Sequence, residues 1–176
     1  MLSILKLIVD AIAVLLGSAL LLRFWMQAIR VRPPSSVAQF TFQLSDWLVR
    51  PLRRIVPGVG GYDWASLIGA FLIVLAATSI LFFAGWPWPA VALMAFQRFL
   101  EWILYGFMAL LVIEAIFSWV NPHAPLAPFV RALNEPLLRP IRRVVPLVGN
   151  LDLSLLVALI LLQIAQLLLG MAFAGR

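Results

Sequence analysis

The sequence LVRPLRRIVPGVGGYD at residues 48–63 returns 89 positions later as LLRPIRRVVPLVGNLD at residues 137–152. The two stretches agree at ten of sixteen positions, and three more positions exchange one aliphatic residue for another. Each stretch lies between two long apolar segments. The chain is therefore predicted to be a duplicated unit of helix, basic loop and helix, with repeats at residues 1–86 and 87–176.

The apolar segments predict an all-α membrane protein with four transmembrane helices. Hydrophobic residues make up 64% of the chain and charged residues 11%, and the mean hydropathy is +1.07. Such a chain cannot cover its surface with polar atoms in water. Segments long enough to cross a bilayer lie at about residues 7–29, 64–86, 99–120 and 153–174, and residues 89–98 are expected to cap the third at the interface. Two spans per unit make the repeats parallel.

The basic residues set the expected orientation. Nine of the thirteen Lys and Arg residues lie in two long connections, residues 30–63 and 121–152. Because positively charged loops remain in the cytoplasm, we expect both basic loops inside and both termini outside. Apolar stripes just before each motif predict an amphipathic helix at the membrane interface in each loop.

Prolines and glycines divide each motif. The residue before a proline is disfavoured in the α conformation, and proline suits the first turn of a helix. We therefore expect a short, separate helix to begin at Pro51 and at Pro140. Gly60 and Gly149 are expected to allow the tight turn that follows.

Several charged residues are candidate structural sites. Asp63 and Asp152 fall where the next apolar helix begins, a position that favours an N-cap. Arg23 and Glu114 have opposite charges at roughly equivalent positions of the two repeats, which suggests an intramembrane ion pair. A local structural bridge, or an Arg23 side chain that reaches the interface, is the alternative.

Two further pairs are expected within single helices near the outer interface. Lys6 lies four residues before Asp10, and Arg98 lies three residues before Glu101. These spacings place each pair on one helix face.

The six motif arginines allow two interpretations. They act in topology and general headgroup anchoring, or they form a specific basic pocket for an anionic lipid or for the acidic patch of a partner. Topology needs positive charge but not the repeated RPxRR spacing, which keeps the second interpretation open. The residues are Arg50, Arg53, Arg54, Arg139, Arg142 and Arg143.

The paired motif resembles the YggT family of integral membrane proteins. The stretches LLLRFWMQ at 20–27 and AIFSWV at 115–120 are also similar to its members, and the resemblance covers nearly the whole chain. It implies a multi-pass protein of the bacterial inner membrane, without an established biochemical activity, in a family linked to envelope or osmotic stress and to cell division. Its plastid relatives act in haem attachment to a cytochrome b subunit.

The sequence does not favour catalysis. It has no cysteine, a single histidine and no nucleotide-binding loop, so we expect no catalytic site, metal site or cofactor. The arginines flank membrane spans, which favours anionic headgroups over nucleic acid as the polyanion. The predicted function is a non-enzymatic scaffold or assembly factor that contacts anionic lipid, a partner protein or a second copy. The alternative is a small oligomeric ion or solute transporter or channel with Glu114 in its path.

Overall fold

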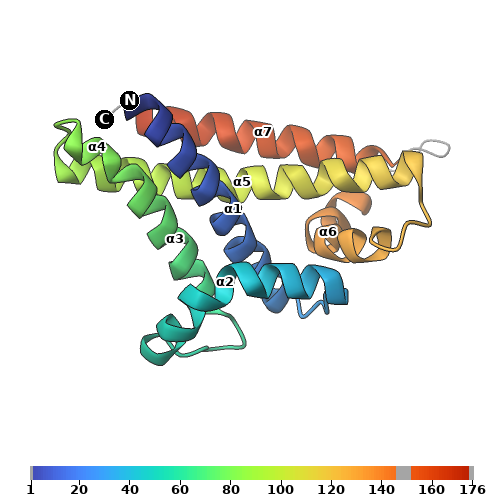
Figure 1. The fold of residues 1–176 in the computed structure, drawn as a ribbon. Helices are drawn as coiled ribbons and strands as arrows, with labels where there is room; N and C mark the ends of the chain where they lie inside the picture. The colour runs from blue at the N-terminus through green and yellow to red at the C-terminus, as the bar shows by residue number, and fades with distance from the viewer. Residues whose placement is uncertain (1, 146–151, 175–176) are drawn as a thin grey trace. The chain divides into compact units, whose positions relative to one another are not determined.

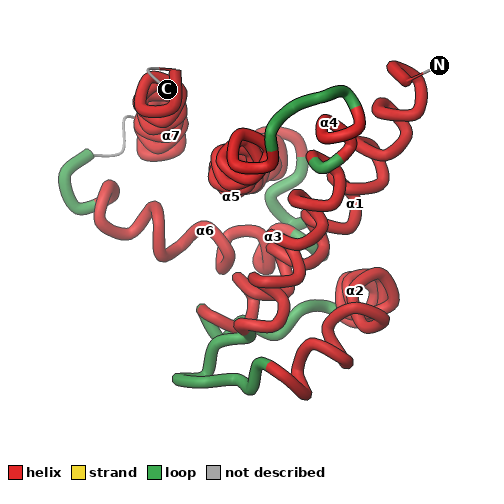
Figure 2. Tube along the Cα trace, turned by 90° about the vertical axis from the view of Figure 1, so that its left-hand side faces the viewer, coloured by secondary structure: helices red, strands yellow, loops and turns green. Residues whose placement is uncertain are grey.

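The computed structural model describes residues 2–145 and 152–174, and every regular element in this part of the chain is a helix (Figures 1 and 2). The sequence prediction of an all-α fold is confirmed. The helices are α1 (Leu2–Ala28), α2 (Ser35–Ile55), α3 (Trp64–Thr78), α4 (Ile80–Phe83), α5 (Trp88–Val120), α6 (Ala127–Arg142) and α7 (Leu153–Ala174).

Four helical segments are long and apolar enough to cross a membrane. They are Ile4–Ala28, Trp64–Phe83, Trp88–Val120 and Leu153–Ala174. These segments correspond to the four predicted spans, and α7 has the same bounds as the fourth. The remaining helices, α2 and α6, lie in the two long connections and are called the connecting helices below.

The chain divides into two compact units. The first comprises residues 1–30 and 35–102, and the second comprises residues 31–34 and 103–176. The division falls inside α5, so that this helix contributes its first part to one unit and its last part to the other. The repeat boundary at residues 86 and 87 stays a prediction.

In the first unit, α1 and α3 pack along one another and α2 packs against both. Gly69 of α3 makes the close approach possible, because a Cβ atom there would lie 3.3 Å from Leu48 and 3.5 Å from Leu20. Gly17 of α1 performs the same role toward Trp102, whose ring would lie 2.3 Å from an added Cβ. Small residues thus allow the apolar helices of this unit to approach closely.

In the second unit, α6 packs against α7, and the buried core joins these two helices to the last part of α5. Its buried members are Leu111, Leu138, Leu155, Ala158 and Leu162. Each connecting helix is therefore held by burial on its own unit as well as by its charges.

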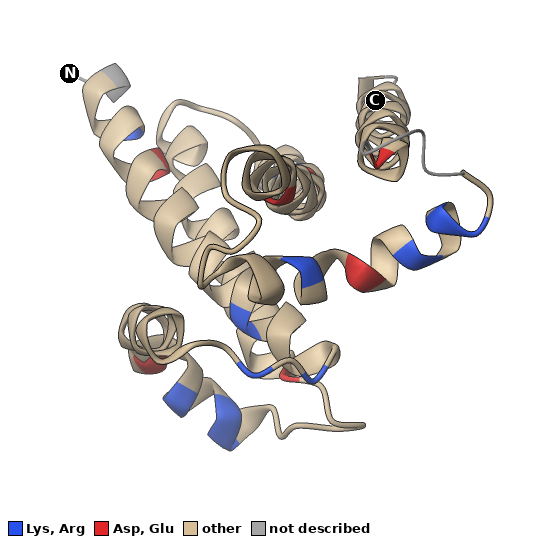
Figure 3. Ribbon diagram, turned by 90° about the vertical axis from the view of Figure 1, so that its right-hand side faces the viewer, with Lys and Arg blue, Asp and Glu red and all other residues tan. Residues whose placement is uncertain are grey.

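The prediction that a new helix starts at each motif proline is wrong. Pro51 lies inside α2, and Pro136 and Pro140 lie inside α6. An internal proline removes one backbone hydrogen bond and bends the helix without ending it when packing holds both sides. Figures 2 and 3 show that α2 changes direction along its length. The first part of each motif, residues 48–55 and 137–142, is therefore the last part of a longer helix.

Two apolar segments also differ in detail from the prediction. The second span is broken at Ser79, between α3 and α4. The hydroxyl of Thr78 donates to Val74 O at 2.8 Å and that of Ser79 to Ala76 O at 2.7 Å, and such bonds perturb a helical turn. In the third, residues 88–98 continue α5 as one helix of 33 residues, about 50 Å long.

The turn near the end of the first motif requires glycine. Gly60 and Gly61 have φ angles of +70° and +84°, in the left-handed region that residues with a side chain rarely adopt. The predicted role of Gly60 is confirmed. Gly149, its counterpart in the second motif, lies outside the described residues.

Candidate functional site

The two copies of the motif form the same ion pair. Arg53 Nη2 lies 2.6 Å from Asp63 Oδ2, and Arg142 Nη2 lies 2.8 Å from Asp152 Oδ2. Each pair spans ten residues and joins the end of a connecting helix to the start of the next apolar helix. The pair therefore fixes how each connecting helix meets the helix that follows it.

In the first repeat the shared aspartate is buried. Asp63 is 2% exposed, accepts a hydrogen bond from Ser66 Oγ at 2.7 Å and lies 3.3 Å from Arg23 Nε. Asp63 occupies the N-cap position of α3, and its backbone carbonyl accepts from the N–H groups of Ser66 and Leu67. Its carboxylate makes no cap hydrogen bond. The side chain instead neutralises two guanidinium groups.

Arg23 extends this network from α1 to α2. Its Nη1 donates to Ser45 Oγ and to Asp46 Oδ1, both at 2.7 Å, and its guanidinium lies 4.8 Å from the centre of the Phe42 ring. Arg23 is 7% exposed. A buried guanidinium needs such compensation, so Arg23 ties α1 to the connecting helix and to the start of α3.

In the second repeat the apolar helix contributes a buried anion, Glu114, where the first repeat has the buried cation Arg23. Glu114 of α5 is 6% exposed. Asn134 Nδ2 of α6 donates to Glu114 Oε2 at 2.7 Å and to Leu110 O at 2.9 Å. Arg142 Nη2 lies 3.3 Å from Glu114 Oε1. The apolar helix is again joined to the connecting helix and to the shared Arg–Asp pair.

Arg142 is the centre of the second network. Besides Asp152 and Glu114, it pairs with Glu135 through Nη1 at 2.9 Å, so that one guanidinium contacts three carboxylates. The other oxygen of Asp152 accepts from the backbone N–H of Ser154 at 3.0 Å, which is the hydrogen bond expected of an N-cap on α7. Figure 3 shows one acidic position among the basic positions along α6.

Comparison with known proteins supports the resemblance found in the sequence. The family model CCB3/YggT matches residues 1–84 and 93–173. The chain belongs to the CCB3/YggT family. The match in two segments is consistent with two repeats of one family unit.

Similar proteins occur in several bacteria. The chain is 34% identical over 160 residues to the "Uncharacterized protein in proC 3'region" of Vibrio alginolyticus, covering 85% of this chain and 84% of that protein. It is 32% identical over 146 residues to the "Uncharacterized protein YggT" of Escherichia coli K12, covering 82% and 78%. No solved structure matches the chain.

The structure of this CCB3/YggT family member adds residues that sequence reasoning missed. Ser45 and Asp46 lie in the first network, and Asn134 and Glu135 lie in the second. The two dipeptides are related by the same offset of 89 residues as the motif. Extending the repeat alignment a few residues upstream of Leu48 would have found them, since a polar residue followed by an acidic one occurs in both copies.

The six motif arginines separate into two groups. Arg53 and Arg142 form the shared pairs, and Arg50 pairs with Asp46 at 2.7 Å. The other three are exposed, and no ion pair or side-chain hydrogen bond is found for them within the described residues. These three, called the free arginines below, are Arg54, Arg139 and Arg143.

The acidic residues of the networks are held in their charged forms. A hydrogen bond from Arg23 is the main cause that lowers the pKa of Asp46. Burial alone would raise the pKa of Asp63, but hydrogen bonds from Arg53 and Ser66 outweigh it, and the pKa lies below its usual value. The same balance, with Arg142 as the main donor, lowers the pKa of Asp152. The aspartates are therefore anions at neutral pH.

Arg23 and Glu114 each have partners within their own unit. A direct pair between them stays a prediction. Among the described residues, no group of three or more His, Asp or Glu side chains is arranged to hold a metal ion. The two networks hold each connecting helix in place. They also neutralise some of the motif arginines and leave the others able to contact another anion.

Proposed function

We propose that this family member is a non-enzymatic membrane scaffold whose free arginines hold anionic lipid headgroups at the cytoplasmic face of the bacterial inner membrane. The observation that carries the proposal is the division of the six motif arginines. Three are already neutralised by carboxylates, whereas Arg54, Arg139 and Arg143 are exposed and free for another anion.

Arginine is suited to this task. Its planar guanidinium donates two parallel hydrogen bonds to a phosphate, and a basic side chain near an anionic membrane surface contributes about 1 kcal/mol. The free arginines lie at the ends of amphipathic connecting helices, where headgroup contact would hold each helix against the membrane. The proposed orientation has both basic loops in the cytoplasm and both termini outside.

The second repeat offers the better defined site. Arg139 in the last turn of α6 and Arg143 at its C-cap, with Pro136 and Pro140, line an open depression of about 380 Å³. None of the described residues that line it is acidic. A phosphate there would contact two guanidinium groups without competition from an acidic side chain.

Lipid enrichment provides the test. The purified protein is incubated in mixed micelles with equal amounts of phosphatidylglycerol and phosphatidylcholine, and bound lipid is measured by native mass spectrometry. We expect the triple variant Arg54→Gln, Arg139→Gln, Arg143→Gln to lose the preference for phosphatidylglycerol by about tenfold or more. The Lys versions should lose part of it, because lysine keeps the charge but not the bidentate contact.

Arg50→Gln is the matched control, because Arg50 belongs to the same motif but pairs with Asp46. It should retain the lipid preference. Equal phosphatidylglycerol enrichment in the wild type and the triple variant would overturn the proposal.

A role in envelope or osmotic stress is tested by growth after osmotic upshift. A strain lacking the protein should be complemented by the wild type and not by the triple variant.

A further inference from the structure

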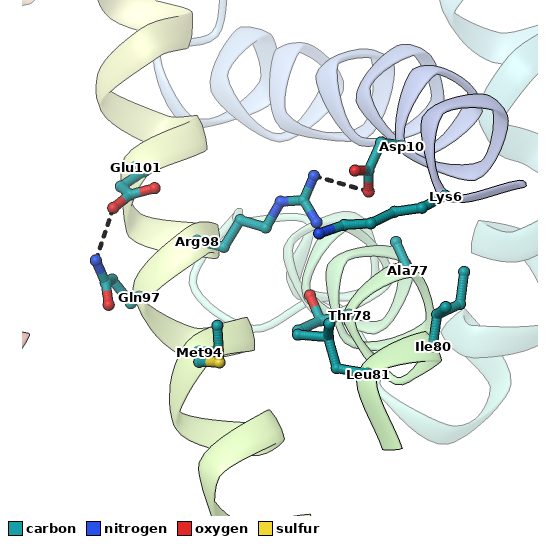
Figure 4. A pocket seen from close by; sticks show the side chains of 10 residues that line it. All are labelled: Lys6, Asp10, Ala77, Thr78, Ile80, Leu81, Met94, Gln97, Arg98 and Glu101. Carbon is teal, nitrogen blue, oxygen red and sulfur yellow. Dashed lines mark hydrogen bonds and ion pairs between the residues drawn. The ribbon is translucent and has the colours of Figure 1, made fainter. Parts of the chain in front are cut away.

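A polar pocket lies at the end of the first unit remote from the motif. It has a volume of about 270 Å³ and is formed by the start of α1, the end of α3 with α4, and the first part of α5. Figure 4 shows its side chains. Its polar lining residues are Lys6, Asp10, Thr78, Gln97, Arg98 and Glu101.

One ion pair in the pocket joins two helices. Arg98 Nη2 lies 2.8 Å from Asp10 Oδ1, and the Arg98 guanidinium lies 5.6 Å from the centre of the Trp102 ring. The expected pairs within single helices are therefore wrong for Arg98, which crosses from α5 to α1 instead of pairing with Glu101. Trp102 of α5 lies against Gly17 of α1, and this contact brings the two helices, and with them the two oppositely charged groups, together.

This cross-helix pair leaves two charges of opposite sign. Lys6 has no ion-pair partner among the described residues, and Glu101 accepts a hydrogen bond only from the neutral amide of Gln97, at 2.9 Å. In Figure 4 the Lys6 side chain enters the pocket from α1, while Glu101 and Gln97 lie on α5. A cation and an anion thus line separate walls of one pocket.

The remaining lining is apolar, and it comes from α3, α4 and α5. Lys6 is exposed and Glu101 is partly buried, so both charged groups remain accessible to a ligand of opposite charge. A ligand with one charge would compensate Lys6 or Glu101 and leave the other. We propose that the pocket binds a zwitterion, with its acidic group at Lys6 and its ammonium group at Glu101.

The volume limits the ligand to a small molecule or a headgroup. Two sources share this chemistry: a free zwitterion, and the headgroup of an ethanolamine phospholipid that enters from the membrane. Both carry an ammonium group and an acidic group separated by a few bonds. None of the free arginines lines this pocket. The pocket lies at the end of α3 opposite Asp63 and the first motif.

Calorimetric titration of the purified full-length protein tests the proposal. The free probe is glycerophosphoethanolamine, the lipid probe is dihexanoyl-phosphatidylethanolamine, and glycerophosphoglycerol is the probe that has the phosphate without the ammonium. We expect at least one ethanolamine probe to bind about tenfold more tightly than glycerophosphoglycerol. Binding of the free probe identifies a soluble zwitterion, and binding of the lipid probe alone identifies a headgroup.

Neutral variants test the two contacts separately. Lys6→Gln and Glu101→Gln should each weaken binding about fivefold or more, while Arg32→Gln, which removes an exposed charge elsewhere, should not. The double exchange Lys6→Glu with Glu101→Lys should restore binding, because a zwitterion can bind in the reverse direction. The proposal is overturned if glycerophosphoglycerol binds as well as the ethanolamine probes, if neither ethanolamine probe binds, or if Glu101→Gln has no effect.

Discussion

The buried aspartate of the first motif and its partly exposed counterpart in the second should differ in their contribution to stability. Asp63→Asn removes a carboxylate that is 2% exposed and that accepts from Arg53 and Ser66 and lies 3.3 Å from the buried Arg23. Asp152→Asn removes one that is 19% exposed. The two substitutions change the same atoms at equivalent positions, so the surroundings decide the difference.

The magnitudes follow from what each substitution leaves behind. Removing one partner of a buried ion pair costs about 3–5 kcal/mol. Arg23 keeps Asp46 at 2.7 Å and Arg53 is 46% exposed, so we expect the lower end, about 3 kcal/mol. Arg142 keeps Glu114 and Glu135 after Asp152→Asn. Asp152→Asn should therefore lower the free energy of unfolding by about 1 kcal/mol, the contribution of an ordinary hydrogen bond.

Unfolding of the purified protein in mixed micelles at increasing mole fraction of denaturing detergent measures both values. The free energy of unfolding should fall by about 2 kcal/mol more for Asp63→Asn than for Asp152→Asn. Ser66→Ala is the graded control and should cost about 1 kcal/mol, because it removes a single hydrogen bond to Asp63. If Asp152→Asn destabilises the protein as much as Asp63→Asn does, burial of the first pair does not set its energy and the reasoning fails.

Four other outcomes are expected. The pKa of Asp63 is lower in the folded than in the unfolded chain. Its contribution to stability is therefore present above about pH 4 and is lost as the pH falls through the folded pKa. Asp63→Asn should flatten the plot of unfolding free energy against pH below about pH 4. Gly17→Ala should lower the thermal midpoint, because its Cβ would lie 2.3 Å from the Trp102 ring and overpacking costs about 1–3 kcal/mol; Trp102→Leu should reduce this effect. Arg50→Gln should change the unfolding free energy by less than about 1 kcal/mol, because Arg50 is 78% exposed and surface pairs contribute little. A reporter fused to the C-terminus should be active outside the cytoplasm, and cytoplasmic activity would contradict the proposed orientation.

The sequence was sufficient to predict the fold class and the recurring elements. Apolar length alone predicts the four spans, and α7 begins and ends where expected. The 89-residue offset predicts that both motifs share one local geometry, and both form the Arg–Asp pair at the same spacing. These features depend on local composition and on repetition, which a single sequence displays directly.

The features that were missed depend on tertiary packing. Local preferences predict a helix start at Pro51, but packing on α1 and α3 holds α2 together through the proline. Two partners of Arg23, Ser45 and Asp46, are 22 and 23 residues away along the chain, a separation at which no helical spacing places them together. Arg98 likewise takes its partner, Asp10, from another helix. Periodicity describes one helix at a time, so it cannot identify pairs that depend on how two helices pack.

The two networks explain why identical arginines differ in availability. In the first repeat the apolar helix supplies a buried cation, Arg23, and the acidic residue of the connecting helix, Asp46, contacts both Arg23 and Arg50. In the second repeat the apolar helix supplies an anion, Glu114.

Glu135, the counterpart of Asp46, contacts Arg142, and no acidic partner is found for Arg139 among the described residues. The sign of one buried charge therefore accompanies a change in which motif arginine is neutralised. The arginines occupy the same positions in both motifs, so a difference in headgroup binding between the two turns must originate in the residues around them. Exchanging the dipeptide Ser45-Asp46 with Asn134-Glu135 between the repeats should therefore change which motif arginine is free in each turn.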